Sequence, residues 1–158
     1  MPTSQERVTV REFRESDRER VLQLAPRLIA GMPPWRDRDG CHAAIEQWVN
    51  AAMDRDTTHG NLLVATNQEE EVIGFIGFEQ QTHFSGGRDV YVGEIVVDPD
   101  CEGRGIGTML MHSVEEMARA RGFRTVTLTT GAANDRARAF YTNLGYEEEA
   151  ITLTKVIP

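Results

Sequence analysis

Apolar residues along this chain are spaced regularly enough to predict most of its helices. The helix that starts at Ile106 is the clearest, because its apolar residues recur on one face of a 3.6-residue repeat. Gly122 follows its last turn, where a glycine commonly ends a helix. A second helix is predicted over Asp39 to Met53 on the same grounds. The two apolar faces consist of Ile106, Met109, Leu110, Val114, Met117 and Ala118 in the first helix, and of Ile45, Trp48, Val49 and Ala52 in the second.

A shorter helix is predicted near the N-terminus. Ser16 and Glu19 have the spacing of a capping box, in which two side chains accept hydrogen bonds from backbone N–H groups of the first turn. Pro26 should kink or end this helix, because proline has no N–H and its ring clashes with the preceding turn.

Runs of alternating and β-branched residues predict six strands, and a further helix covers Asn134 to Leu144. The strands are Thr3 to Phe13, Asn61 to Thr66, Glu71 to Glu79, Val90 to Val97, Arg124 to Thr130 and Tyr146 to Ile157. The second and third of them flank a polar turn and should form a hairpin. The order of elements fits an α/β (α+β) fold with a mixed sheet of six to seven strands and helices on both faces.

The composition describes one acidic domain that spans residues 1–158. The formal net charge of −8 argues against a nucleic-acid-binding protein. The same acidity suits attraction of a cationic amine, but it is also common among soluble proteins in general.

Other features bear on the compartment and on metals. Cys41 and Cys101 do not have the spacing of metal ligands, so we expect no bound metal. Free thiols fit a reducing cytoplasm, where we expect the protein to reside. No apolar stretch is long enough to cross a membrane, and the polar N-terminus lacks the apolar centre of a signal peptide, so we expect no membrane partner.

The glycine-rich stretch before the third helix carries the strongest functional signal. Gly103, Gly105 and Gly107 lie between an apolar strand and a helix N-terminus, where unpaired N–H groups and the helix dipole bind phosphate. A dinucleotide-binding fingerprint would need a third glycine at position 108, where this chain has Thr108. A nucleotide P-loop is excluded too, because no Gly-Lys-Ser/Thr tripeptide occurs.

A second motif follows about thirty residues later. It reads Asn134-Asp-Arg-Ala-Arg-Ala-Phe-Tyr-Thr-Asn-Leu-Gly-Tyr146. Together the two motifs resemble those of the GCN5-related N-acetyltransferase (GNAT) family, an Arg/Gln-x-x-Gly-x-Gly/Ala loop and an Asn-x-x-Ala-x-x-Phe-Tyr-x-x-x-Gly-Phe/Tyr helix. The resemblance is tightest over residues 90–146. This chain departs from it at Glu102, where the family usually has Arg or Gln, and Arg104 next to it offers a compensating charge.

The resemblance implies an acyl-CoA N-acyltransferase fold with a splayed sheet, and acetyl-CoA as co-substrate. The pyrophosphate would be held by backbone amides of the glycine loop, and the pantetheine arm by the strand before it. A backbone N–H near Val96 would stabilise the oxyanion. The residues implied are Ile95, Val96 and Val97 on the strand, Gly103, Arg104, Gly105, Ile106, Gly107 and Thr108 in the loop, and Asn134, which is also suited to cap the last helix.

Two residues are candidates for acid and base. By resemblance Tyr141 lies near the thioester sulfur and acts as general acid, although a core aromatic beside Phe140 is the structural alternative. Glu94 is a carboxylate in an otherwise apolar strand, where partial burial would raise its pKa and suit it as general base. Its structural alternative is a salt-bridged or solvent-facing residue at the edge of the sheet.

We therefore interpret the sequence as an acetyl-CoA-dependent N-acetyltransferase that acts by direct attack of a primary amine. A small cationic amine is the first acceptor class, and a protein N-terminus or lysine side chain is the second. A non-catalytic acyl-CoA sensor is the alternative from a different class. A homodimer is compatible with the family, but no residue in the sequence identifies an interface.

Overall fold

The structure, a computed structural model, describes residues 7–55 and 60–158. Its strands are β1 (Thr9–Glu12), β2 (Gly60–Thr66), β3 (Val72–Thr82), β4 (Arg88–Val97) and β5 (Val126–Leu128). Its α-helices are α1 (Arg18–Leu24), α2 (Arg38–Asp54), α3 (Ile106–Ala120) and α4 (Asp135–Asn143). Three short 3₁₀ helices join them, η1 (Glu15–Asp17), η2 (Ala25–Ile29) and η3 (Pro99–Cys101).

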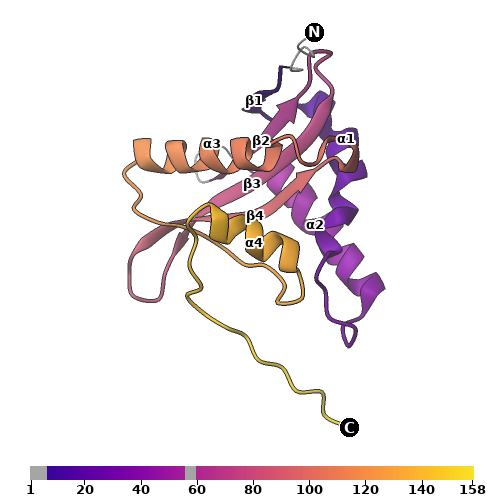
Figure 1. The fold of residues 1–158 in the computed structure, drawn as a ribbon, viewed down its shortest axis with the longest axis vertical. Coiled ribbons are helices and arrows are strands. Elements are labelled where there is room, and N and C mark those ends of the chain that lie inside the picture. The colour runs from indigo at the N-terminus through magenta and orange to yellow at the C-terminus, as the bar shows by residue number, and fades with distance from the viewer. Residues whose placement is uncertain (1–6, 56–59) are drawn as a thin grey trace.

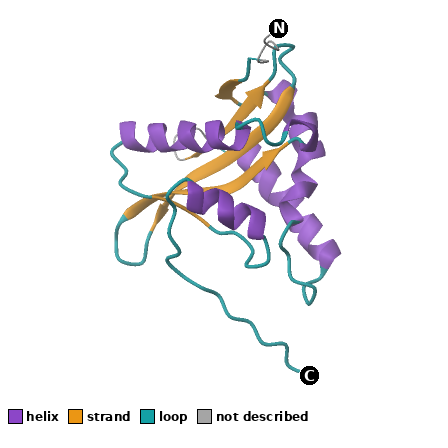
Figure 2. Ribbon diagram, in the orientation of Figure 1, coloured by secondary structure: helices purple, strands orange, loops and turns teal. Residues whose placement is uncertain are grey.

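The five strands form one sheet in the order β1-β2-β3-β4-β5. The first four are antiparallel neighbours, and β5 pairs in parallel with β4 (Figure 1). Helices α1 and α2 pack on one face of the sheet, and α3 and α4 on the other (Figure 2). Side chains of β2 and β3 alternate between the two resulting cores, so the predicted three-layer α/β fold is confirmed.

Helix α3 has the predicted ends. Gly105 is its N-cap and Gly122 follows its C-cap residue Arg121, and both glycines have the positive φ angles that glycine adopts without strain. The apolar face is also as predicted, with one exchange: Met109 is at the surface, and the neighbouring Met111 is fully buried.

The N-terminal helices correct two expectations. The capping side chain is that of Asp17, not Ser16, and it acts at the start of η1, which leads into α1: the Asp17 carboxylate accepts a hydrogen bond from the Arg14 N–H at 2.8 Å and also pairs with Arg11. Pro26 stands at the start of η2, so α1 ends at Leu24 as expected. On α2, the predicted apolar face is buried except for Trp48, which is 59% exposed.

Strand β4 contains one extra residue relative to β3, and this residue reverses which side chains of β4 face each side of the sheet. Gly77 on β3 is opposite Glu94, but Phe78 is opposite Val92, so Gly93 is a bulge with no partner. On the N-terminal side of the bulge, Val90 and Val92 join the core beneath α3 and α4. Beyond it the pattern inverts, because Glu94 and Val96 point to the α1/α2 side.

The end of the chain differs most from the prediction. Residues 147–158 form no strand and are all exposed, so the strand expected over Tyr146 to Ile157 is absent. The sheet accordingly has five strands, not six or seven. Strand β5 spans only three of the seven residues predicted for it, and residues 3–6 of the predicted first strand lie outside the described residues.

Candidate active site

The C-terminal half of β4 has a neighbour on one side only. The β4–β5 pairing runs from Val90–Val126 to Val92–Leu128 and then ends. In the described chain, Glu94 to Val97 therefore pair with β3 alone. The predicted separation of the two strands is present, and it begins at the Gly93 bulge.

The hydrogen bonding of β4 identifies which backbone groups face the open side. Asp98 donates its N–H to the Ile73 carbonyl at 2.8 Å, so Asp98 is directed at β3. Because direction alternates along an antiparallel ladder, Val96 and Glu94 also face β3, whereas Ile95 and Val97 face away from it. Val96, near which we expected the oxyanion donor, therefore directs its own N–H at β3, and the N–H groups of its two neighbours face the open side. Their N–H and C=O groups form a free strand edge that an extended pantetheine arm fits.

The glycine loop after β4 presents further unpaired donors. The first bond inside α3 runs from the Met109 N–H to the Gly105 carbonyl at 3.0 Å, so the N–H groups of Ile106, Gly107 and Thr108 have no partner within the helix. Gly103 and Gly105 have φ angles of 74° and 77°, and a Cβ on either would meet no atom within 4 Å. The loop surface is thus open, and it has the donors and the dipole that bind a pyrophosphate.

Glu102 does not leave an uncompensated negative charge beside this loop. Its carboxylate pairs with Arg136 of α4 at 2.6 Å and with Arg27 of η2. The sequence analysis did not select these two arginines. Their ion pairs connect the glycine loop to α4 and to η2. The site therefore holds two cations close to the expected position of the phosphates, together with Arg104 in the loop itself.

Glu94 is buried on the α1/α2 side of the sheet, with only 7% of its surface exposed. Burial raises the pKa of its carboxyl to about 7, opposed by the positive charge of Arg55 and reinforced by the negative charge of Glu79. Gly77 stands directly opposite, and a methyl group there would collide with Glu94 Oε2. The Glu94 carboxylate thus occupies the space that a side chain at position 77 would fill.

Tyr141 is on α4, at the other face of the sheet. Its ring packs edge-on against Phe140 and Tyr146, with ring centres 5.1 and 5.9 Å away. Burial raises the pKa of Tyr141 to about 12, so the phenol stays protonated over the whole physiological range. Gly107 in α3 lies under Phe140, where an added Cβ would be 3.2 Å from the ring, so the glycine loop and α4 are in direct contact.

Asn134 has the structural role that the sequence suggested for it. Its Oδ1 accepts a hydrogen bond from the Ala137 N–H at 3.2 Å, which caps α4. Its Nδ2 donates to the Ala30 carbonyl at 3.5 Å, and a Cβ on Gly31 would be only 2.6 Å from its own Cβ. The loop before α2 and the start of α4 therefore pack tightly together.

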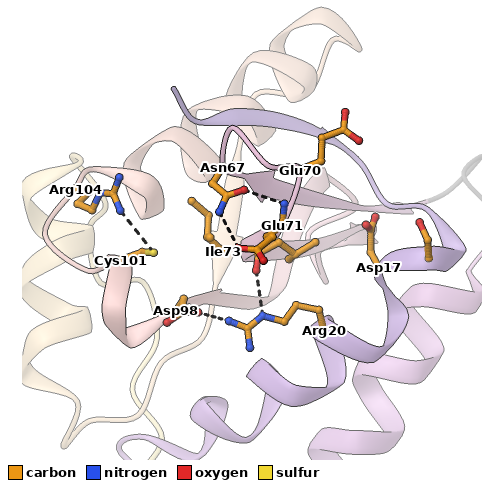
Figure 3. A pocket seen from close by; sticks show the side chains of 11 residues that line it. Asp17, Arg20, Asn67, Glu70, Glu71, Ile73, Asp98, Cys101 and Arg104 are labelled. Atoms are coloured by element: carbon orange, nitrogen blue, oxygen red, sulfur yellow. Dashed lines mark hydrogen bonds and ion pairs between the residues drawn. The ribbon is translucent and has the colours of Figure 1, made fainter. Parts of the chain in front are cut away.

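A polar cavity of about 520 Å³ lies elsewhere, between α1, the β2–β3 turn and η3 (Figure 3). Inside it Arg20 pairs with Asp98 and donates to the Val72 carbonyl at 3.2 Å. Asp98 also accepts from the Asp100 N–H at 2.9 Å, so it shapes the turn that leads into the glycine loop. Neither Glu94 nor Tyr141 lines this cavity, but Arg104 of the glycine loop does.

Two negative findings apply to residues 7–55 and 60–158. No helix there is long and apolar enough to cross a membrane. No three histidine, cysteine, aspartate or glutamate side chains in these ranges come together as metal ligands.

Comparison with known proteins identifies the family. The sequence profile of the acetyltransferase (GNAT) family matches residues 23–146. An uncharacterised N-acetyltransferase of Methanocaldococcus jannaschii is 50% identical over 58 residues, which are 37% of this chain. The match covers 26% of that protein, so the chain spans about a quarter of its relative.

Solved structures have the same fold at low identity. A protein of Pyrococcus furiosus named as an acetyl transferase superposes with a TM-score of 0.78 at 21% identity, over 96% of this chain and 100% of the other. Aminoglycoside N-acetyltransferase AAC(6')-Iy, solved in complex with CoA, superposes with a TM-score of 0.71 at 21% identity, over 99% of this chain and 98% of the other. With its fold, its two motifs and the profile match over most of its length, this chain belongs to the GNAT acetyltransferase family.

Proposed function

We propose that this protein is an N-acetyltransferase that transfers the acetyl group of acetyl-CoA directly to a primary amine. The observation that carries the proposal is the unpaired half of β4, which leads from a buried carboxylate into an open glycine loop. Membership of the family and the CoA complex of the structural relative AAC(6')-Iy support acetyl-CoA as the co-substrate.

The cofactor would be held along β4 and the loop that follows. The N–H groups of Ile106, Gly107 and Thr108 would bind the pyrophosphate, with Arg27 and Arg136 nearby to neutralise it. The carbonyl of Ile95 and the backbone groups of Val97 would pair with the amide groups of the pantetheine arm. This arrangement delivers the thioester to the point where β4 and β5 separate.

Glu94 is our candidate for the general base. An amine must lose a proton when its nitrogen forms the new C–N bond, and a carboxylate with a pKa of about 7 accepts it better than an ordinary glutamate does. Because Glu94 is on the α1/α2 side, the amine would approach from that face. The N–H of Ile95, one residue further on, would then stabilise the charge that develops on the acetyl oxygen.

Tyr141 is our candidate for the group that assists departure of the thiolate as the C–S bond breaks. A phenol with a pKa of about 12 is a weaker acid than a thiol of pKa about 8.5, so complete proton transfer is unfavourable. A hydrogen bond from the neutral phenol to the sulfur still stabilises the developing charge. Tyr141 therefore contributes less than Glu94.

Small cationic amines are the acceptor class we favour. The net charge of −8 attracts cations. The structural relative AAC(6')-Iy is named as an aminoglycoside N-acetyltransferase, and its complex with the bisubstrate analogue CoA-S-monomethyl-acetylneamine superposes with a TM-score of 0.69. A protein N-terminus or a lysine side chain is the second class.

The test is acetyl-CoA-dependent release of free thiol over a panel of polyamines, aminoglycosides, amino acids and peptides. Turnover with a cationic amine that forms the acetylated amine, identified by mass spectrometry, supports the proposal and names the acceptor. Acetyl-CoA binding measured by calorimetry, without turnover on any member of the panel, would instead favour a non-catalytic acyl-CoA sensor.

A further inference from the structure

Three charged side chains from different elements lie together on the α1/α2 side of β3. Glu94 of β4 is the first, and its carboxylate stands over Gly77, the β3 residue opposite it. Glu79 is two residues beyond Gly77 on β3, so its side chain leaves the strand on the same face. Arg55, the C-cap residue of α2, is the third. The end of α2 therefore brings a cation to the part of β3 that faces the buried carboxylate.

The Arg55 guanidinium is held by two consecutive residues of β3. Its Nη1 donates to the Phe78 carbonyl at 3.3 Å, and its Nη2 pairs with the Glu79 carboxylate at 3.5 Å. Because Phe78 directly follows Gly77, these contacts hold the guanidinium beside the residue over which Glu94 stands. The Arg55 side chain is 24% exposed, so water and salt screen its charge only in part.

A purely structural role is the alternative for an arginine at a helix end, where such side chains often bond to the last carbonyls of the helix. Among the contacts of the described residues, however, the Arg55 guanidinium bonds to β3 and not to carbonyls of α2. Its placement thus serves the sheet face that carries Glu94 and does not complete the helix.

The two neighbours act on the Glu94 carboxyl in opposite directions. Burial raises the pKa of Glu94 most, the positive charge of Arg55 lowers it, and the negative charge of Glu79 raises it further. In the described chain these are the charged groups that act on Glu94, one from the end of α2 and one from β3. Arg55 acts as a nearby charge, because its hydrogen bond and its ion pair are made with Phe78 and Glu79.

We propose that Arg55 is a positioning residue for the reaction: held by Phe78 and Glu79, it supplies the positive charge that keeps enough of Glu94 ionised at neutral pH to accept a proton. The inference rests on the proposed role of Glu94 as the base. Without Arg55, burial and Glu79 would together hold the Glu94 carboxyl in its protonated form at pH 7, and a protonated carboxyl cannot accept the proton of the amine. Arg55 would act through Glu94 and not on the substrate.

The first test is the pH profile of kcat/KM with an acceptor from the panel. Arg55→Gln should raise the midpoint by roughly one pH unit, and Glu79→Gln should lower it by roughly half a unit, because Glu79 is nearly half exposed. Arg55→Lys keeps the positive charge and should keep the midpoint near pH 7. The control is Arg18→Gln, which removes an arginine that pairs with Asp54 at the same end of α2 and should leave the midpoint unchanged.

The size of the rate loss separates the electrostatic role from a structural one. A midpoint that rises by about one unit reduces the ionised fraction at pH 7 from a half to about a tenth, so Arg55→Gln should be about 5-fold slower there. At pH 9 the variant and the unmodified protein should have nearly equal rates. A loss of the same size at every pH, or the same loss in Arg55→Lys, would mean that Arg55 only supports the fold, and would overturn the inference.

Carbon-13 NMR of the glutamate carboxyl groups measures the ionisation of Glu94 without catalysis. The Glu94 signal is identified by its absence from the spectrum of Glu94→Gln, and its midpoint should move up in Arg55→Gln and down in Glu79→Gln. An unchanged carboxyl midpoint in Arg55→Gln would overturn the inference, whatever the rates. A carboxyl midpoint that moves while the rate profile does not would support the effect of Arg55 on Glu94 and refute the role of Glu94 as base. The two measurements therefore distinguish failure of this inference from failure of the proposed function.

Discussion

The two halves of β4 are parts of one strand with opposite properties. From Val90 to Val92 the strand has neighbours on both sides, and Val90 and Val92 are buried in the core beneath α3 and α4. From Glu94 to Val97 it has one neighbour, and it begins with a buried carboxylate. A single extra residue, Gly93, separates the halves. It reverses which side chains of β4 face the α1/α2 side and which face the α3/α4 side.

Under the proposed function, the open half of β4 holds the reaction centre. Unpaired backbone groups inside a protein are costly, and so is a buried carboxylate. A substrate that pairs with the free edge of β4 would satisfy the unpaired backbone groups. An amine that gives up its proton would make use of the buried carboxylate. Changes in the open half should therefore affect catalysis, whereas matched changes in the paired half should affect stability or nothing. The five predictions below test this distinction, starting with the largest effect.

Gly105→Val should have the largest effect. Gly105 has a φ angle of 77°, which valine adopts only with strain, and the added side chain would stand on the open surface of the loop. We expect acetyl-CoA affinity, measured by calorimetry, to fall by roughly 100-fold or more. Gly86→Val is a matched control, because Gly86 also has a positive φ and open space but lies in the β3–β4 turn. Equal affinity in both variants would remove the loop from the binding site.

Glu94→Gln should lower kcat by roughly 100-fold, while Asp89→Asn in the paired half should leave it nearly unchanged. Glu94→Gln should also stabilise the folded state at alkaline pH. Because burial raises the pKa of Glu94 from 4.5 to about 7 in the folded state, the folded chain binds the proton more tightly than the unfolded chain. The stability of the unmodified protein therefore falls as pH rises from 4.5 to 7.

The size of that stabilisation can be measured by urea unfolding. At pH 8 the free energy of unfolding of the Glu94→Gln variant should exceed that of the unmodified protein by about 3 kcal/mol at most. The difference should shrink as the pH approaches 5. A difference independent of pH would show that the Glu94 carboxyl is not perturbed by burial.

Gly77→Ala should reduce kcat by about 10-fold without loss of stability. The new methyl group would collide with Glu94 Oε2, which is the end of a flexible side chain and can move, so the fold persists but the base is displaced. Gly87→Ala, in the same hairpin, meets only the Ser85 hydroxyl at 3.8 Å and serves as control. Thermal unfolding and steady-state kinetics of the two variants separate the effects.

Tyr141→Phe should lower kcat by about 10-fold, because one hydrogen bond to the leaving sulfur is lost. Tyr146→Phe is its control. The Tyr146 hydroxyl already bonds Glu115, so that variant should lose stability and keep its turnover rate. If the two variants were equal in rate, Tyr141 would be a packing residue only.

Glu102→Gln should have the smallest effect, a few-fold gain in acetyl-CoA affinity. Removing the negative charge frees Arg27 and Arg136 from their ion pairs and increases the positive potential near the phosphates. The gain should fade as salt is raised from 0.05 to roughly 0.5 M, because surface charges are then screened. A loss of affinity would mean that Glu102 is needed to hold the loop in place.

Much of the fold was predictable, because local signals determine it. Helix α3 follows from its apolar repeat and its two terminal glycines, and the β2–β3 hairpin follows from its turn. Glu94 was identifiable because a carboxylate in an apolar strand is costly, and the raised pKa agrees with that reasoning. The glycine loop was predictable for the same reason as α3, since the two are one continuous motif.

Features that depend on residues far apart in the sequence were not predictable. The role of Gly77 requires knowledge of the β3–β4 register. Gly93 is a lone glycine inside a strand, which is a signal for a bulge that the sequence analysis did not use. Arg27 and Arg136 meet Glu102 across 75 and 34 positions. Residues 147–158 have the pattern of a strand, but a strand also needs a neighbour to pair with, and in the structure these residues have none.

The pH dependence of thiol release most directly tests the claim that the open half of β4 is the reaction centre. With saturating acetyl-CoA and an acceptor from the panel, kcat/KM of the unmodified protein should rise through a midpoint near pH 7, as Glu94 loses its proton. The Asp89→Asn variant should keep that midpoint, and Glu94→Gln should lose it along with most of its rate. A midpoint near pH 7 that persists in Glu94→Gln would contradict the account, because another group would then be the base.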